Sequence, residues 1–113
     1  MNISSKFVSD NILKLSVDTT LSNVLHKEFR AAYENKSAEK IIIDLCHEEN
    51  IDSSGLGMLL LLRDYSGADS ANIEIINCSD NVLNIFHITC FFRLFHIPQY
   101  KDHKPVPPAA NAV

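Results

Sequence analysis

The sequence predicts an α/β domain with a mixed, largely parallel β-sheet and helices packed against it. Apolar stretches with strand spacing alternate along the chain with apolar stretches that have helix spacing. Two strands come first, and a helix then separates each later pair of strands, which is the connection that parallel strands need. At 113 residues with 46% hydrophobic and 21% charged side chains, the chain suits one domain with its own core.

Several stretches have the character of strands. They are a weak strand near Phe7, followed by residues 11–17, 40–46, 72–77 and 94–97. In the second of these, Leu13, Leu15 and Val17 alternate with polar residues, which is typical of a half-buried strand. Residues 40–46 are almost continuously apolar, which indicates a central strand. Pro98 ends the last and shortest strand.

Three stretches have the character of helices. The first begins at Leu21, and its apolar stripe consists of Leu21, Val24, Leu25, Phe29 and Ala32. The second covers residues 56–65, and Gly67 is its expected stop. The third begins at a cap formed by Ser79 or Asp80 and runs to about Ile88.

Composition and charge exclude several classes of function. The net charge is −4 and the basic residues are scattered, which argues against nucleic acid as a partner. Cys46, Cys78 and Cys90 lack paired spacing and the histidines lack ligand spacing, so we expect no disulfide, metal, cofactor or catalytic site. No apolar run approaches the roughly 18 residues of a membrane span, and the N-terminus lacks a signal-peptide core. We expect a cytoplasmic protein without membrane insertion.

The expected domain covers residues 1–100. Residues 101–113 contain three prolines, which prevent a regular helix. We expect these residues to form a flexible Pro-rich tail.

The most informative stretch is the loop of Asp52, Ser53, Ser54 and Gly55, where an apolar strand gives way to a helix. Asp and Ser are preferred N-caps because their oxygens accept the first free N–H groups of a helix. If the two serines serve only as caps, removal of each costs about 1 kcal/mol. A hydroxyl held there is also exposed, and a phosphate on it meets free N–H donors and a favourable helix dipole.

This loop and three further stretches resemble the STAS domain family, in particular its anti-sigma factor antagonists. The further stretches are the strand that contains Asp44, the helix of residues 56–65, and residues 81–95, which are similar to the family's final helix and closing strand. The resemblance covers residues 7–98. It implies a STAS-like fold and a non-enzymatic switch that is controlled by serine phosphorylation.

The resemblance also implies roles for individual residues. Ser53 immediately follows the Asp of the loop and is the implied phosphorylation site, whereas Ser54 is the nearer candidate for a structural cap. Asp18 matches an Asp at the start of the family's first helix, where a partner surface lies. The expected partner-binding set is Asp18, Asp52, Ser53, Ser54, Gly55, Met58 and Leu62.

The implied partner is a serine kinase or anti-sigma factor of the histidine-kinase-like ATPase group, with a phosphatase of the PP2C type that resets the switch. A second possibility is a STAS subunit of a lipid-transport ABC complex. In that case the same loop contacts the ATPase, and phosphorylation is not required.

The helix that follows the loop is apolar on more than one face. Leu56, Leu59 and Leu60 form one stripe, and a second consists of Met58, Leu61, Leu62 and Tyr65. Either both stripes are buried, or part of the second is a partner-binding patch.

The sequence departs from the family at Cys90, which stands where a Gly usually ends the third helix. A left-handed backbone costs a residue other than Gly roughly 1 kcal/mol or more. We therefore expect this turn to adopt another geometry.

Overall fold

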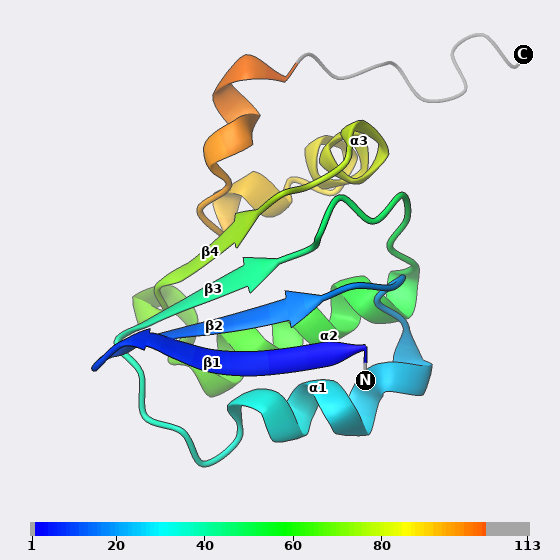
Figure 1. Ribbon diagram of the computed structural model, residues 1–113. Coiled ribbons are helices and arrows are strands. Elements are labelled where there is room, and N and C mark those ends of the chain that lie inside the picture. Colours follow the sequence, from blue (N-terminus) through cyan, green and yellow to red (C-terminus); the bar gives the residue numbers. More distant parts are fainter. Residues whose placement is uncertain (1, 104–113) are drawn as a thin grey trace, which may run out of the picture.

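The computed structural model describes residues 2–103 and contains a four-stranded sheet in the order β1-β2-β3-β4. Residues 104–113 of the expected tail lie outside the described part. The strands are β1 (Ile3–Ser9), β2 (Ile12–Val17), β3 (Lys40–Asp44) and β4 (Ile73–Ile76), and the α-helices are α1 (His26–Tyr33), α2 (Ser53–Tyr65) and α3 (Asp80–Ile88) (Figure 1). β1 is antiparallel to β2, and the other two pairs are parallel. The predicted mixed, largely parallel sheet is confirmed.

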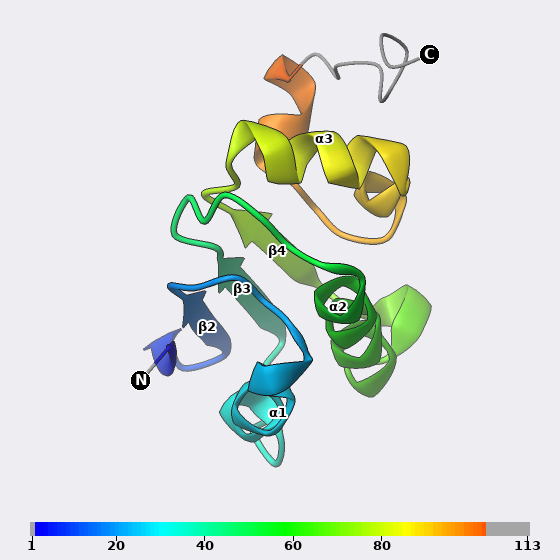
Figure 2. The same ribbon diagram turned by 90° about the vertical axis from the view of Figure 1, so that its right-hand side faces the viewer.

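The core lies on the face of the sheet that α1 and α2 cover (Figure 2). Leu15, Ile43 and Ile75 are register neighbours on this face, and each is fully buried. α3 lies beyond the β4 side of the sheet. Alternate burial along β2 and β4 is the result expected when one face of a sheet packs on helices and the other remains more open.

The first helix begins later than predicted. Residues Asn23–Leu25 form a 3-10 helix, and α1 follows it from His26. Leu21 lies outside the helix because it forms a parallel β-bridge with Ile51. The predicted apolar stripe is also wrong at Val24, because this residue is 84% exposed.

The third helix has its predicted bounds. Ser79 is the N-cap and its hydroxyl accepts the backbone N–H of Val82 at 3.1 Å. The expectation for Cys90 is wrong, because this residue does adopt the left-handed conformation, with φ 60° and ψ 29°. The turn brings the ring of Phe91 onto that of Phe86, with centroids 5.6 Å apart, and this packing favours the strained geometry.

The last predicted strand is reduced to one bridge. His96 forms a parallel bridge with Glu74 of β4. The backbone N–H of His96 donates to the Ile73 carbonyl, and its carbonyl accepts the N–H of Ile75. The chain then enters a 3-10 helix, Pro98–Asp102, because proline cannot donate the next ladder hydrogen bond. This helix crosses the boundary expected at residue 100, and the Tyr100 ring stacks on Phe92 at 4.3 Å.

Candidate functional site

The candidate site lies where the parallel strands β2 and β3 end. Strands that run in parallel deliver the residues after them to the same edge of a sheet. Asp18 follows β2 directly, and the loop of residues 45–52 connects β3 to α2. The hydroxyl of Thr20 donates to Glu48 at 3.1 Å, which joins the two loops.

Asp52 is the N-cap of α2, so neither serine has this role. Its Oδ1 atom accepts the backbone N–H of Gly55 at 2.8 Å and the hydroxyl of Ser54 at 2.6 Å. The Ser54 hydroxyl, followed by the Gly55 N–H, lowers the pKa of Asp52 because both stabilise its charged form. The N-terminus of α2 therefore already has one fixed negative charge.

Ser54 connects α2 to the segment that precedes α1. Its Oγ atom accepts the backbone N–H of Asn23 at 2.8 Å while it donates to Asp52. Both hydrogen-bonding functions of this hydroxyl are thus in use. Sequence reasoning missed Asn23, and the only available signal was the Ser22-Asn23 pair, which is typical of a turn.

Ser53 lies at the first position of α2 and is exposed. Its hydroxyl has no hydrogen-bond partner among residues 2–103. The two neighbouring serines therefore differ in chemistry: the hydroxyl of Ser53 is available to an external group, whereas Ser54 holds the local structure.

Gly55 is a packing residue rather than an exposed contact, which corrects its place in the partner-binding set. A Cβ atom at this position would lie 2.1 Å from the carbonyl oxygen of Leu21 and 2.9 Å from Cγ1 of Ile51. Only glycine permits this close approach between α2 and the Leu21 segment.

The expected partner-binding patch on α2 is wrong for Met58 and Leu62. Their side chains are 4% and 0% exposed, because positions 55, 58, 59 and 62 form the face that packs into the core. Leu60 and Leu61 face outward instead and are 41% and 48% exposed. Among the exposed apolar residues of α2, these two leucines are the nearest in sequence to the loop that precedes the helix.

Tyr65 belongs only partly to this outward surface. The residue is 45% exposed, but its ring packs edge-on against Tyr33, with centroids 5.1 Å apart. Its hydroxyl accepts the backbone N–H of Asn35 at 2.9 Å. Tyr65 therefore fastens the end of α2 to the end of α1.

Asp18 is exposed at the same edge as the loop, as expected from its position after β2. It lies close enough to Cys46 to act on the thiol: burial raises the Cys46 pKa most, and the charges of Asp44 and Asp18 add to the effect. The segment that follows Asp18 reaches the Asp52–Ser54 loop through the bridge between Leu21 and Ile51 and the hydrogen bond between Thr20 and Glu48.

Asp44 is the buried carboxylate that shapes this edge. It accepts the backbone N–H of Cys46 at 2.9 Å and the side-chain amide of Asn77 at 3.0 Å, and Lys14 lies 3.4 Å away. Burial alone raises its pKa, but these donors outweigh burial and the net pKa is lowered. Asp44 therefore remains charged and fixes the chain as it leaves β3.

Residues 2–103 contain no group of three or more His, Cys, Asp or Glu side chains that could hold a metal ion. The cysteines at 46, 78 and 90 are all free thiols. Among the helices of this part of the chain, none combines the length and apolar character that crossing a bilayer requires.

Comparison with known proteins identifies one family. The STAS domain family model matches residues 5–104. A STAS-domain containing protein of Pseudomonas aeruginosa (strain UCBPP-PA14) is 45% identical over 74 residues, which cover 64% of this chain and 73% of that protein.

Two solved structures share the fold. The anti-sigma factor antagonist SpoIIAA in its unphosphorylated form superposes with a TM-score of 0.70 at 17% identity, covering 88% of this chain and 90% of that one. An anti-sigma factor antagonist from Mycobacterium paratuberculosis gives a TM-score of 0.67 at 20% identity and covers 88% and 89% of the two chains. With a family model that matches most of its length, a close relative and this shared fold, the chain belongs to the STAS domain family.

Proposed function

We propose that this protein is a non-enzymatic phospho-switch of the anti-sigma factor antagonist type, with Ser53 as the phosphate acceptor. One observation carries the choice of residue. The Ser53 hydroxyl is exposed and unbonded among the described residues, whereas the Ser54 hydroxyl bonds both Asn23 and Asp52. A kinase can reach Ser53 without first breaking a hydrogen bond in the protein.

Phosphorylation changes the charge of this surface strongly. A phosphoserine has a charge of about −1.5 to −2 at neutral pH. On Ser53 this charge adds to that of Asp52, whose lowered pKa keeps it ionised. Burying such a site in an interface without a cationic partner costs several kcal/mol, and each 1.4 kcal/mol or so is a factor of ten in affinity. With these energies, the unmodified protein binds its partner and the phosphorylated protein is released from it.

The proposed partner surface differs from the expected one. It comprises Asp18, Asp52, Ser53 and Ser54 at the edge of the sheet, and Leu60 and Leu61 on the outward side of α2. The exposed leucines supply the apolar contact that the buried Met58 and Leu62 cannot.

The partner that this function requires is a serine kinase or anti-sigma factor of the histidine-kinase-like ATPase group, and a PP2C-type phosphatase restores the unmodified form. The two structural neighbours support this class of partner, since both are described as anti-sigma factor antagonists. We place the exchange in the cytoplasm, where such ATPases find ATP.

Phosphopeptide mass spectrometry from the native cell, with and without the phosphatase, tests the proposal. We expect phosphate on Ser53, retention of the partner by Ser53→Ala and loss of the partner by Ser53→Asp. Ser54→Ala is the matched control for the phosphorylation measurement alone, because it removes the adjacent hydroxyl and should still be phosphorylated on Ser53. If Ser53 is never phosphorylated and Ser53→Asp behaves as wild type in the cell, the switch is refuted. Co-purification with an ABC-transporter ATPase would then favour the subunit role.

A further inference from the structure

A second surface lies at the free edge of the sheet, on β1. Asn2 accepts the backbone N–H of Asp18 at 3.0 Å, and hydrogen-bonded pairs alternate along an antiparallel ladder. The backbone groups of Ile3, Ser5 and Phe7 therefore point away from β2. Glu28 on α1 already accepts the Ile3 N–H at 2.9 Å. The N–H and C=O groups of Ser5 and Phe7 are left at an open edge, where a further strand could pair.

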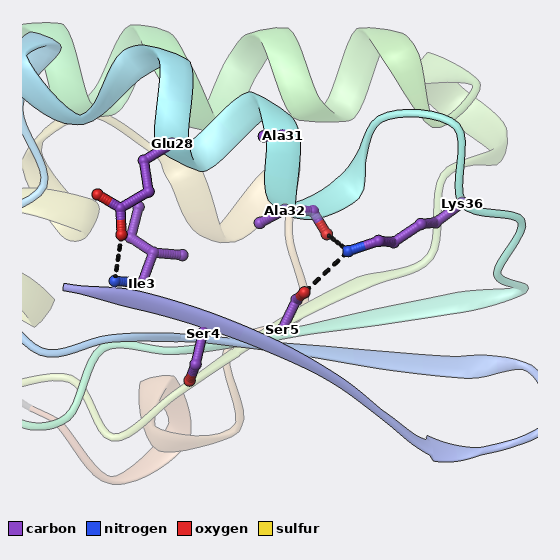
Figure 3. A pocket seen from close by; sticks show the side chains of 7 residues that line it. All are labelled: Ile3, Ser4, Ser5, Glu28, Ala31, Ala32 and Lys36. Carbon is purple, nitrogen blue, oxygen red and sulfur yellow. Dashed lines mark hydrogen bonds between the residues drawn. The ribbon is translucent and has the colours of Figure 1, made fainter. Parts of the chain in front are cut away.

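A pocket opens beside this edge, between β1 and α1 (Figure 3). Its volume is about 380 Å³, and it is lined by Ile3, Ser4, Ser5, Glu28, Ala31, Ala32 and Lys36. Most of these side chains are small, which creates the hollow. Lys36 Nζ donates to Ser5 Oγ at 2.8 Å and to the Ala32 carbonyl at 2.9 Å, and it holds one wall in place. The hollow has room for an apolar side chain of moderate size.

Two lysines lie on the other face of the sheet at this edge. Lys6 is the register partner of Lys14 on β2, and like charges in such a pair repel. Lys14 forms an ion pair with Asp44, with 3.4 Å between Nζ and Oδ2. Lys6 is exposed and has no ion-pair partner among residues 2–103. A carboxylate placed beside Lys6 would compensate this charge.

We propose that the edge of β1 binds an extended segment of a partner protein by strand addition, with alternating apolar and acidic side chains. Successive side chains of a strand point to opposite faces. A residue paired beside Ser5 can thus place an apolar side chain in the pocket, while its neighbour places a carboxylate near Lys6. The added strand also covers Phe7 and Val8, which are 42% and 48% exposed. A second copy of this chain fits less well, because its own β1 brings another Lys6 and no carboxylate.

Amide hydrogen exchange of the full chain, followed by NMR, tests this surface. The probe is a capped seven-residue peptide of alternating valine and glutamate, and the control peptide replaces glutamate with lysine. We expect the valine-glutamate peptide to slow exchange at Ser5 and Phe7 and the lysine peptide to have a weaker effect. Lys6→Glu should reverse this preference.

Ser5→Pro removes one outward N–H donor and keeps the β1–β2 ladder, since proline is tolerated where the N–H faces solvent at a sheet edge. It should weaken peptide binding by up to about tenfold. Ser5→Ala is the matched control, because it loses the same bond to Lys36 but retains the N–H. If Ser5→Pro fails to fold, Ala31→Phe provides the test by filling the pocket from α1, and it should also weaken binding.

Several results would overturn the proposal. These are an unchanged exchange rate at Ser5 and Phe7 in millimolar peptide, equal binding of both peptides, or wild-type binding by folded Ser5→Pro or by Ala31→Phe. Protection of the same amides that rises with protein concentration alone would identify a second copy as the occupant and overturn the choice of partner.

Discussion

The hydroxyl of Ser54 accepts the backbone N–H of Asn23, 31 residues earlier in the chain, at 2.8 Å. Through this bond the first turn of α2 holds the 3-10 helix Asn23–Leu25 in place. The exposed Val24 side chain belongs to that 3-10 helix, so its position also depends on Ser54. The neighbouring Ser53 hydroxyl forms no such bond within residues 2–103.

Ser54→Ala should therefore destabilise the fold while Ser53→Ala does not. The first change removes bonds to Asn23 and Asp52, and a net loss of about 1 kcal/mol is typical of such bonds. The second removes an exposed hydroxyl that bonds nothing in the described part of the chain, which should change the free energy of unfolding by less than about 0.5 kcal/mol. Urea denaturation of both variants measures the difference, and equal effects would contradict the structural role of Ser54.

The two glycines of α2 should respond to alanine in opposite directions. A Cβ at Gly55 meets the Leu21 carbonyl, so Gly55→Ala should cost about 1–3 kcal/mol through overpacking. A Cβ at Gly57 meets nothing within 4 Å, so Gly57→Ala should stabilise the helix by up to about 1 kcal/mol. Thermal denaturation compares the pair directly. Destabilisation by Gly57→Ala would show that the helix packs differently at this position.

Acid should destabilise the protein partly through Asp44. Its pKa in the folded state is lowered, because donors from Cys46, Asn77 and Lys14 outweigh burial. The stabilisation is therefore present above the unfolded-state pKa of about 3.9, and it is lost as pH falls through the lower folded-state value. Urea denaturation across this range should show a steeper loss of stability for wild type than for Asp44→Asn. An identical acid dependence in the two proteins would assign the effect to other carboxylates.

The three cysteines should separate by reactivity toward a thiol reagent. Burial, helped by the charge of Asp44, raises the pKa of Cys78 to about 12, so this thiol should react only when the protein unfolds. Cys46 and Cys90 are exposed and should react in the native protein, with Cys46 slowed by its raised pKa. At neutral pH, the absorbance of a chromogenic thiol reagent should count two thiols in the native protein and three in denaturant. Three native thiols would show that Cys78 is accessible.

The sequence predicts the elements of this fold well because each has its own periodicity or cap. Alternation marks β2, and the Ser79 cap marks the start of α3. Exposure on a helix is harder to predict when apolar residues surround it, since the side that packs depends on neighbours elsewhere in the chain. The sequence pattern therefore predicts Met58 and Leu62 at the surface, whereas in the structure they face the core.

The same limit applies within the loop. Ser53 and Ser54 have nearly the same local sequence, and no periodicity separates their hydroxyls. The difference arises from the distant backbone of Asn23, which only the tertiary structure brings to Ser54. The family resemblance, rather than local chemistry, selected Ser53 as the candidate phosphate acceptor.

A pair of lysine substitutions on α2 separates the partner surface from the core. Leu61 is 48% exposed, so Leu61→Lys should leave the fold intact and weaken binding of the proposed partner kinase. Met58 is 4% exposed, so Met58→Lys places a charge in the core and should unfold much of the protein at room temperature. Circular dichroism checks folding, and calorimetric titration measures binding by the folded variant. If Leu61→Lys folds and binds the kinase as tightly as wild type, the outward leucines of α2 are not part of the interface, and the contact must lie around Asp18 and the Ser53 loop instead.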